Sequence, residues 1–546
     1  MPARSGGAKA LRCVCTVSLL FVQFAATLAA QPCQSGQKSA PPSSRPRFLS
    51  VKDGRFIDTY GRQVILHGVN LVNKSKASGY IGDETLQDFV LMADWGFNCI
   101  RLGIIWDGLE PEPGKFNEDY LRRIDEQIRW AKRAGLQVLL DIHQDLFSVK
   151  FSDGAPAWAT LDEGQPHIAT GEVWSDAYFT SPAVQRAFDN FWANASAPDG
   201  IGVQDHYARA WAHVARRYAN EPAVIGYDLM NEPFEGTSGA QMQAAAMGRL
   251  AEALAAREGS ARANPEAVMQ KWATPEGRSQ LMQALRDVNL YKQILDVAEA
   301  GSHAFERAKL MPMCARVGRA IREVDRNHIL FVEPSISTNA GVRSAMGLLT
   351  DADGKPEPLQ AFAPHGYDAV TDTPDVAAAS NDRVELIFVR HGETAQRLAL
   401  PMLVGEWGAY YSSSGATPAA RFVVAQFEKL LCSDTYWSYT KDLAKAAYLP
   451  VIARPYPMEI SGTLTSYSAD FDHRKFSATW KESPAVNAPT RIYLPKSFLG
   501  SKHRIRLSPR GIGYKIEFSG RGGNQYLIIR PTGKAVERRL TIALPS

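Results

Sequence analysis

The chain has 546 residues, 61 of them basic and 57 acidic, which leaves a formal net charge of +4. A single α/β barrel takes about 250 residues or somewhat more, so this length predicts at least two domains. The charges are mixed along the chain without the concentrated basic stripe that nucleic-acid binding requires, so nucleic acid is excluded as an expected partner.

Residues 1–30 have the layout of a secretory signal peptide. Three basic residues precede an apolar stretch over 13–28, and small residues follow up to Ala30. This predicts cleavage near Ala30 and a secreted or periplasmic protein. An uncleaved membrane anchor is the alternative, but the stretch is short for a span and contains polar residues such as Thr16, Ser18 and Gln23.

A flexible leader is predicted over 31–46, which is rich in Pro and Ser. Four cysteines remain beyond the signal peptide, and they show neither a C-x-x-C pair nor a His spacing suited to zinc. We therefore expect no metal site built on cysteine. No disulfide is assigned among Cys33, Cys99, Cys314 and Cys432.

Eight β-rich runs then alternate with helical patterns, such as those over 119–134, 204–218 and 313–324. Near-continuous apolar strands separated by helices indicate a parallel sheet that is buried on both faces. Eight such units predict an α/β fold, a (β/α)8 TIM barrel over 47–448. Its strands are expected at 64–69, 99–104, 137–142, 224–229, 328–333, 362–367, 402–406 and 435–439.

Two segments fall outside this alternation. Residues 239–310 are Ala-rich and helical, and they exceed the one helix that a barrel needs after strand four, so they predict a helical insertion. Its apolar side chains either pack internally or form a lid that contacts lipid. From 449 to 546, short strands with turn residues predict an all-β sandwich domain, which serves as a structural support or as a carbohydrate-binding module.

Polar residues follow the barrel strands at one end. In a (β/α)8 barrel the active site lies at the carboxyl ends of the strands. Each residue alone has an ordinary explanation, such as an ion pair for Arg101, core packing for His143 and Trp437, or a helix cap for Glu232, but the coincidence predicts a concave polar site. Its expected members are Asn70, Lys74, Arg101, His143, Asp145, Asn231, Glu232, His365, Tyr367, Glu406 and Trp437.

Glu232 and Glu406 suggest the chemistry. Cleavage of a glycosidic bond with retention needs two carboxyl groups across roughly 5–5.5 Å, one as acid/base and one as nucleophile. The acid needs a raised pKa, whereas the nucleophile must stay ionised, for which Arg101 and Tyr367 could supply hydrogen bonds. The remaining expectations are that Asn231 binds a sugar 2-hydroxyl, that Trp437 offers a face to the sugar ring, and that His143 and His365 position the acid/base.

Together these motifs resemble the family-five glycoside hydrolases, which are retaining enzymes with a (β/α)8 barrel. The resemblance is carried by Arg101, His143, the Asn231-Glu232-Pro233 motif, the His365-x-Tyr367 motif, Glu406 and Trp437, in the order of the strands. It implies that Glu232 is the acid/base and Glu406 the nucleophile. It implies no metal and no organic cofactor.

Longer strings resemble endoglycoceramidases and related glycolipid glycosidases. These strings cover 67–74, 141–145, 154–159, 186–192, 228–234 and 454–457. The resemblance implies that Lys74 and Asp145 bind glucose hydroxyls and that an intact glycan is released from its lipid. The 239–310 insertion departs from the family's pattern and leaves glycan size and lipid preference open.

The expected function is therefore a secreted retaining β-glycosidase that cleaves the bond between a glucose-type sugar and a lipid, ceramide first. The expected partners are a glycolipid or oligosaccharide substrate and, transiently, a membrane surface; no protein partner is indicated. A steryl-glucosidase and a cellulase-like endo-β-glucanase are alternatives with the same fold. A non-catalytic glycolipid-binding protein is a further alternative, which the presence of both carboxylates disfavours.

Overall fold

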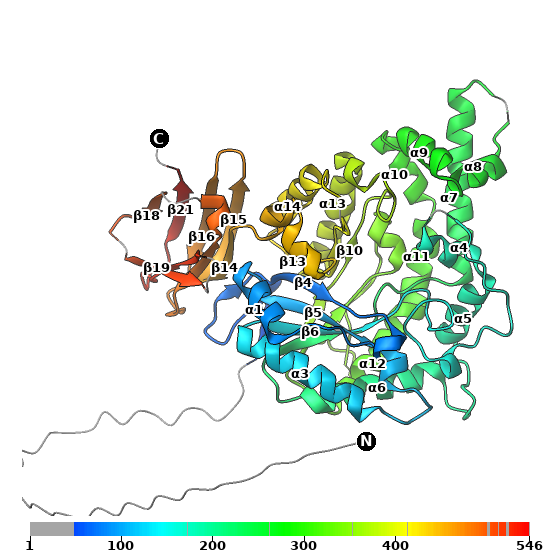
Figure 1. The fold of residues 1–546 in the computed structure, drawn as a ribbon, viewed down its shortest axis with the longest axis horizontal. Helices are drawn as coiled ribbons and strands as arrows, with labels where there is room; N and C mark the ends of the chain where they lie inside the picture. The colour runs from blue at the N-terminus through cyan, green and yellow to red at the C-terminus, as the bar shows by residue number, and fades with distance from the viewer. Residues whose placement is uncertain are drawn as a thin grey trace, which may run out of the picture. The chain divides into compact units, whose positions relative to one another are not determined.

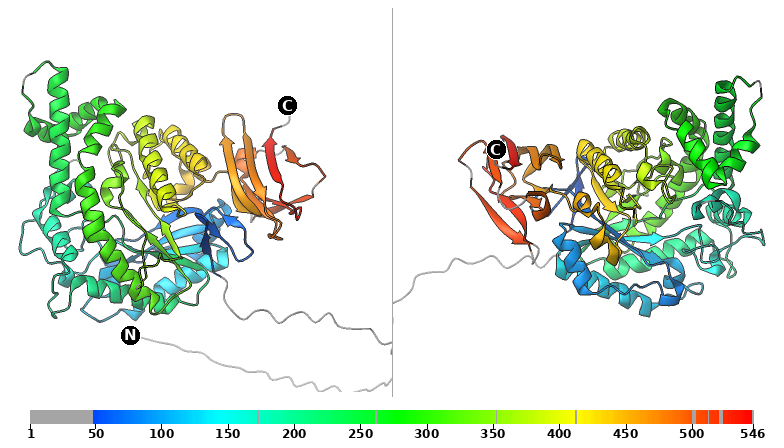
Figure 2. Two further views of the ribbon diagram at one scale, coloured as in Figure 1. Left: turned by 180° about the vertical axis from the view of Figure 1, so that it is seen from behind. Right: turned by 45° about the horizontal axis from the view of Figure 1, so that its top comes forward.

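A cylinder of parallel strands forms the centre of the molecule and is covered on the outside by helices (Figures 1 and 2). The computed structural model describes residues 48–171, 173–260, 262–351, 353–411, 413–499, 503–511, 513–519 and 523–544. The signal peptide, the leader and Cys33 lie outside the described residues.

The cylinder confirms the predicted barrel. Eight parallel strands lie side by side in a fixed order, and a parallel bridge between Phe362 and Met402 joins the last strand to the first. In this order they are β11 (Leu403–Val404), β13 (Ser433–Tyr436), β4 (His67–Leu71), β5 (Cys99–Ile105), β6 (Gln137–His143), β7 (Val224–Asp228), β8 (Ile329–Val332) and β9 (Gln360–Phe362).

The outer helices follow from local sequence signals. In α3 (Glu118–Ala134) the Asn117 side chain caps the first turn by accepting from the Tyr120 N–H, and Gly135 ends the helix in the left-handed conformation. Its apolar stripe packs on the barrel. The other large barrel helices are α1 (Leu86–Asp94), α6 (Val203–Tyr218), α12 (Met311–Arg322), α13 (Asn381–Leu398) and α14 (Thr417–Leu430).

Three predicted strands differ in detail from the observed ones. The expected run 64–69 is divided, because Val64 belongs to β3 (Gln63–Val64) of another sheet and only the part from His67 onward enters the barrel. The sixth and seventh runs break before their polar ends. There, β10 (His365–Gly366) and β12 (Glu406–Trp407) pair with each other, with His365 opposite Glu406, in a separate parallel ladder.

The insertion after strand four is helical. It comprises α7 (Thr237–Arg257), α8 (Pro265–Trp272), α9 (Pro275–Ala284), α10 (Val288–Asp296) and α11 (Glu299–Phe305). Figures 1 and 2 show α7, α8 and α9 side by side in green. These helices share an apolar cluster that also includes Val342 and Val370 from two barrel loops, so the insertion packs on the barrel as well as on itself.

The C-terminal part consists of antiparallel strands in two sheets around a shared apolar core that includes Trp480, Tyr493, Leu527 and Ile542. One sheet contains β15 (Gly462–Asp470), β16 (Lys475–Glu482), β21 (Glu537–Ala543) and β18 (Arg504–Ser508). The other contains β14 (Tyr456–Ile460), β17 (Thr490–Leu494), β20 (Asn524–Ile529) and β19 (Tyr514–Ser519), and it is extended by β3, β2 (Arg55–Ile57) and β1 (Ser50–Lys52) from the N-terminal end.

Residues 50–64 thus belong to the second sheet, although the sequence pattern placed them with the barrel. The backbone of β3 pairs antiparallel with β14, so two segments almost 400 residues apart in the chain form one ladder. Within the described residues, no helix combines the length and the apolar character that a bilayer span needs.

Candidate active site

Arg101 on β5 organises the carboxyl end of the barrel. Its side chain is fully buried and donates to Asp228 Oδ2 (2.9 Å), Glu333 Oε1 (2.9 Å) and Glu406 Oε1 (2.8 Å). The same guanidinium donates to the amide oxygen of Asn231 at 2.9 Å. A buried cation needs such partners, since an unpaired charge inside a protein is strongly unfavourable. Arg101 therefore fixes Glu406 in position.

Glu406 is held from both sides. Its second oxygen accepts a hydrogen bond from the Tyr367 hydroxyl at 2.9 Å. Burial raises the pKa of Glu406 to about 8, and the nearby Glu232 and Glu333 act in the same direction, whereas His365 and Arg101 lower it. Asn70 lies behind this arrangement, where it accepts from Arg101 and donates to a barrel carbonyl.

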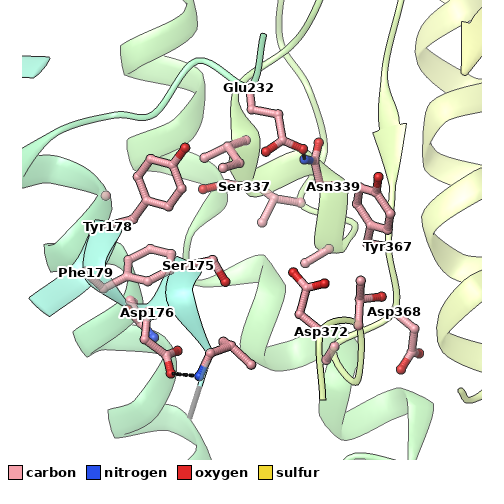
Figure 3. Close-up of a pocket in the computed structure, with 18 of the residues that line it drawn as sticks. Ser175, Asp176, Tyr178, Phe179, Glu232, Ser337, Asn339, Tyr367, Asp368 and Asp372 are labelled. Carbon is pink, nitrogen blue, oxygen red and sulfur yellow. Dashed lines mark hydrogen bonds between the residues drawn. The ribbon is translucent and has the colours of Figure 1, made fainter. Parts of the chain in front are cut away.

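Glu232 faces Glu406 from the loop after β7. Its Oε1 accepts from the Asn339 amide (2.7 Å) and lies 2.9 Å from His365 Nδ1. Its backbone N–H donates to Glu333 at 2.8 Å, and its φ of 44° places it in the left-handed region. A non-glycine residue in that region is strained, and such strain is concentrated at functional sites. Figure 3 shows the Glu232 side chain directed at Asn339, with Tyr367 nearby.

His365 connects the carboxyl groups. It lies between Glu232, Glu333 and Glu406, with ring nitrogens 2.9, 3.2 and 3.6 Å from their oxygens. Burial alone would lower its pKa, but Glu333 and Glu406 raise the pKa of His365 well above its usual value. The imidazole is therefore a cation that donates to Glu232.

The two candidate catalytic carboxyls are close together. One oxygen of Glu232 and one of Glu406 lie within 4.8 Å of each other and of a ring nitrogen of His365. Retaining glycosidases separate the pair by about 5–5.5 Å, whereas inverting enzymes leave about 6.5–9.5 Å for a water molecule. The geometry fits the retaining arrangement.

Lys74, Asp145, His143 and Trp437 form a second group beside the carboxyls. Lys74 hydrogen-bonds to Asp145, and its ammonium lies 4.7 Å from the centre of the Trp437 ring. The rings of His143 and Trp437 are stacked at 5.2 Å. Lys74, Asp145 and Trp437 therefore present an amine, a carboxylate and an aromatic face, which suits a sugar.

His143 is hydrogen-bonded to Asp141 and not to Glu232. Its Nδ1 bonds to Asp141 Oδ2 at 2.9 Å, whereas His365 is the imidazole beside Glu232. Burial, and then the charge of Lys74, hold the pKa of His143 well below its usual value, so its ring is neutral. The Nε2 atom has no hydrogen-bond partner among the described residues and is free to accept from a substrate hydroxyl.

The sequence reasoning missed several members of the site. Glu333 ends the fifth predicted strand at the same edge as the others, so the same argument could have found it. Asn339 lies in the 3-10 helix Ile336–Ala340 and Asp372 in a turn; both line the cavity, and neither carries such a signal. Asp141 lies within β6 and Asp228 is the last residue of β7. They approach Arg101 to 3.1 and 2.9 Å, and only the closed barrel brings them together.

The donor set does not resemble a metal centre. Three groups have the spacing for a cation: His143 with Asp145 and Asp153, Asp228 with Glu333 and His365, and Glu232 with His365 and Glu406. In each group a neighbouring cation already compensates the carboxylates, namely Lys74 in the first and Arg101 or the His365 imidazolium in the others. The expectation of no metal and no cofactor remains a prediction.

The site opens into a cavity of about 400 Å³. Its polar end contains Lys74, Asp145, Glu232, Tyr367, Glu406 and Trp437. Its other end is lined by apolar side chains from the insertion and neighbouring loops, including Met242, Met247, Leu250, Leu285, Ile294, Leu295, Ile336 and Val342. The catalytic carboxyls therefore adjoin a largely apolar chamber.

Comparison with known families identifies the family of the chain. The family model described as "Cellulase (glycosyl hydrolase family 5)" matches residues 57–442, and the family 5 C-terminal domain model matches 454–543. The chain belongs to glycoside hydrolase family 5. It is thus a glycoside hydrolase, as the sequence motifs predicted.

Within family 5, the chain is similar to the endoglycoceramidase of Hydra vulgaris, with 33% identity over 219 residues, which cover 35% of this chain and 41% of the relative. It is also 34% identical over 198 residues to endoglycoceramidase I of Rhodococcus hoagii, and this match covers 36% of this chain and 39% of the relative. The chain thus spans about two fifths of the length of the curated relatives it matches. Among solved structures, endo-glycoceramidase II from Rhodococcus sp. in an iminocyclitol complex has a TM-score of 0.68 and 26% identity, over 92% of this chain and 100% of that one.

Proposed function

We propose that this protein is a retaining β-glycosidase that cleaves the bond between a glucose-type sugar and a lipid aglycone, ceramide in the first place. The observation that supports the proposal is the position of Glu232 and Glu406, which approach within 4.8 Å at the junction of a polar pocket and an apolar chamber. A sugar needs hydroxyl partners, and a lipid aglycone needs apolar surface. The lining of the cavity offers both.

The proposed reaction has two steps. Glu406 attacks the anomeric carbon while Glu232 gives its proton to the leaving lipid oxygen, so that the glycosidic bond breaks and a glycosyl ester forms on Glu406. Glu232, now ionised, takes a proton from water, and the resulting hydroxide attacks the anomeric carbon, releasing the sugar and restoring both groups. Tyr367 and Arg101 stabilise the negative charge on the Glu406 carboxylate as it leaves the anomeric carbon in the second step.

The carboxyl cluster can hold the required proton. Neighbouring carboxylates cannot all ionise in a buried site, so the group retains a proton to a higher pH than an isolated Glu would. The raised pKa values of Glu333 and Glu406, both about 8 and both due first to burial, mean that the cluster retains a proton near neutral pH. The reaction requires that this proton lie on Glu232 while Arg101 and Tyr367 stabilise the ionised form of Glu406. Asn339 donates to Glu232 Oε1, which leaves the second oxygen to carry the proton toward the leaving group.

Substrate identity is tested by incubating the purified protein with glucosylceramide, a ganglioside, a steryl glucoside and a soluble β-glucan. Mass spectrometry of the products then identifies the bond that is cut. We expect free ceramide and an intact sugar from the first two substrates. Products from the glucan alone would make the protein a cellulase-like enzyme, and release of sterol alone a steryl-glucosidase.

The mechanism is tested with Glu406→Gln. A 2-fluoroglycoside with a good leaving group should label the wild-type protein covalently, and Glu406→Gln should abolish the label and lower kcat by about 10³-fold or more. Glu112→Gln is the matched control, because Glu112 is an exposed carboxylate paired with Lys115 and should leave labelling intact. Continued labelling of Glu406→Gln would exclude Glu406 as the nucleophile.

A further inference from the structure

The apolar end of the cavity is enclosed mainly by the insertion. Helices α7 and α10 supply most of its wall, and Trp272 of α8 and Arg278 of α9 reach the same space. Beside them lie Val173, Asp176 and Phe179 from the segment around the short turn Trp174–Asp176 and α4 (Ala177–Thr180). Figure 3 shows Asp176 and Phe179 on this side of the pocket. The tip of the insertion, here defined as α8 and α9, thus contacts the 173–179 segment at the wall of the chamber.

The base of the insertion is fixed to the barrel. Arg390 of α13 donates to Asp296 at 2.6 Å, and Arg383 donates to the carbonyl of Leu285 at 3.2 Å. The Tyr291 hydroxyl donates to the carbonyl of Ala340 at 2.7 Å. Helix α10 therefore forms part of the barrel's rim.

The tip is attached through a charged contact. Asp176 accepts two hydrogen bonds from Arg278, at 2.6 and 2.8 Å, and a third from the Trp272 indole at 3.3 Å. The Arg278 guanidinium also lies 4.5 Å from the centre of the Trp272 ring. Both ions of the pair are buried, with side-chain exposures of 4% for Arg278 and 10% for Asp176. The Asp176 carboxylate thus accepts hydrogen bonds from one side chain of each tip helix.

We propose that the tip is a hinged lid over the lipid end of the active site, latched by Asp176 and Arg278, and that it determines the preference for long apolar aglycones. This inference rests on the proposed function, since it assigns that end of the cavity to the aglycone. With the latch closed, an apolar chain is covered by α7, α8 and α10 and is removed from water. With the latch open, the chamber is exposed and chain length no longer adds to binding.

The chemistry of the latch suits repeated opening. A buried ion pair adds little net stability, because each ion regains its hydration when the pair separates. An apolar contact of the same size would resist separation, since opening it would expose apolar surface to water. An ion pair inside an apolar wall therefore specifies the closed geometry without locking it.

The lid is tested by comparing a glucolipid that carries a long acyl chain with an aryl glucoside that has no chain. In Asp176→Ala and in Arg278→Ala, the ratio of kcat/KM for the glucolipid to kcat/KM for the aryl glucoside should fall at least tenfold. The exchanged pair, Asp176→Arg with Arg278→Asp, should recover most of that ratio, because it restores the latch with reversed charges. Hydrogen exchange in α8 and α9 should be faster in the single variants and return toward the wild-type rate in the exchanged pair.

Arg257→Ala is the control within the insertion. Arg257, the last residue of α7, pairs with Asp287, the N-cap of α10, at 2.5 Å; both side chains are exposed and lie outside the cavity lining. Its removal should leave the ratio unchanged. The lid would be overturned if both latch variants kept the wild-type ratio of kcat/KM values and the wild-type rate of hydrogen exchange in α8 and α9. An equal loss of kcat/KM on both substrates would also overturn it. Failure of the proposed function is a separate result, in which wild-type protein cleaves the aryl glucoside and no glycolipid.

Discussion

At the residue scale, the site depends on the balance between two cations and several carboxylates. Arg101 and His365 face Glu406, Glu333 and Glu232, all buried at the carboxyl end of the barrel. The ionisation of Glu406 is therefore set by its neighbours as much as by burial, since His365 and Arg101 lower its pKa while Glu232 and Glu333 raise it. Removal of one of the cations should shift the pH range of catalysis.

His365→Asn tests this balance. Loss of the imidazolium removes positive charge beside Glu406, so its ionised form is less favoured and its pKa rises further. The acidic limb of kcat/KM against pH, which reports ionisation of the nucleophile, should move to higher pH by roughly one unit. The measurement is a pH–rate profile with an aryl glucoside.

His391→Asn is the matched control for that profile. His391 bonds to the backbone carbonyl of His365 at 2.9 Å, but burial lowers its pKa to about 4, so its ring carries no charge near neutral pH. Its replacement removes a buried imidazole without removing a charge, and the acidic limb should stay in place. A limb that stays in place in His365→Asn, or moves to lower pH, would contradict the assigned role of His365.

At the scale of elements, one buried cluster joins the barrel to the β sheets. Asp434 of β13 accepts from Arg454 (2.6 Å) and from Trp407 (3.1 Å), and His67 of β4 lies 3.1 Å away. Although burial alone would raise it, Arg454 and His67 hold the pKa of Asp434 well below its usual range. Arg454 lies just before β14, so the cluster connects two barrel strands to the first strand of the C-terminal domain.

Arg454→Met should lower the free energy of unfolding by about 3–5 kcal/mol, because it leaves Asp434 buried without its main partner. Arg491→Met is the control, since Arg491 forms a more exposed pair with Glu459 at 3.4 Å and should cost about 1 kcal/mol or less. Urea unfolding of the three proteins measures the difference. A loss in Arg454→Met no larger than that of the control would show that the cluster does not hold the junction.

The pH dependence of that loss has a definite sign. In the wild type, the stability contributed by Asp434 is present above the carboxyl's unfolded pKa, about 3.9, and is lost as the pH falls through the lowered folded value. In Arg454→Met the pKa of Asp434 rises, so protonation relieves the unpaired charge in acid. The difference in free energy of unfolding between the wild type and Arg454→Met should therefore be largest near neutral pH and become smaller toward pH 4.

The sequence predicted those elements whose signals are local. Runs of apolar residues such as 99–105 and 137–143, and the capped helix 118–134, appear within one residue of their expected bounds. The division of the run at Val64 was not predictable in this way, because both halves are apolar and only pairing with β14, almost 400 residues later, separates them. Asn339 and the Asp176 latch were missed for the same reason, since their roles arise from contacts between distant loops.

At the scale of the whole molecule, one β sheet is built from both ends of the described chain, with the barrel between them in sequence. The chain begins its described part in the second sheet, passes through the barrel and returns to complete the same sheet with β14, β17, β20 and β19. Removal of the C-terminal strands from β14 onward would leave β3 paired only with β2 and would expose Ile65, which packs in the shared core of the two sheets. The C-terminal domain therefore supports at least the segment that leads into β4, the first barrel strand along the chain.

The three cysteines of the described residues are protected thiols. Cys99, Cys314 and Cys432 are buried and free, and burial raises the pKa of each, that of Cys99 to about 12. A thiol must ionise to react, so these three should resist oxidation in an oxidising compartment without forming disulfides. Buried free thiols occur in reducing and in oxidising compartments alike, so the export expected from residues 1–30 stays a prediction.

A direct test of export follows the chain's own N-terminus. Expressed with its natural leader in a secreting host, the protein should lose residues 1–30 because small residues at Ala29 and Ala30 suit the signal peptidase, and mass spectrometry should find a mature chain that starts at Gln31. Ala30→Leu should block processing at that position, whereas Ala26→Leu, within the apolar stretch, should leave it unchanged. An unprocessed wild-type chain that remains with the membrane would instead identify residues 13–28 as an anchor. Alkylation of the native mature protein should leave Cys99, Cys314 and Cys432 unmodified until the chain is unfolded, because each thiol is buried.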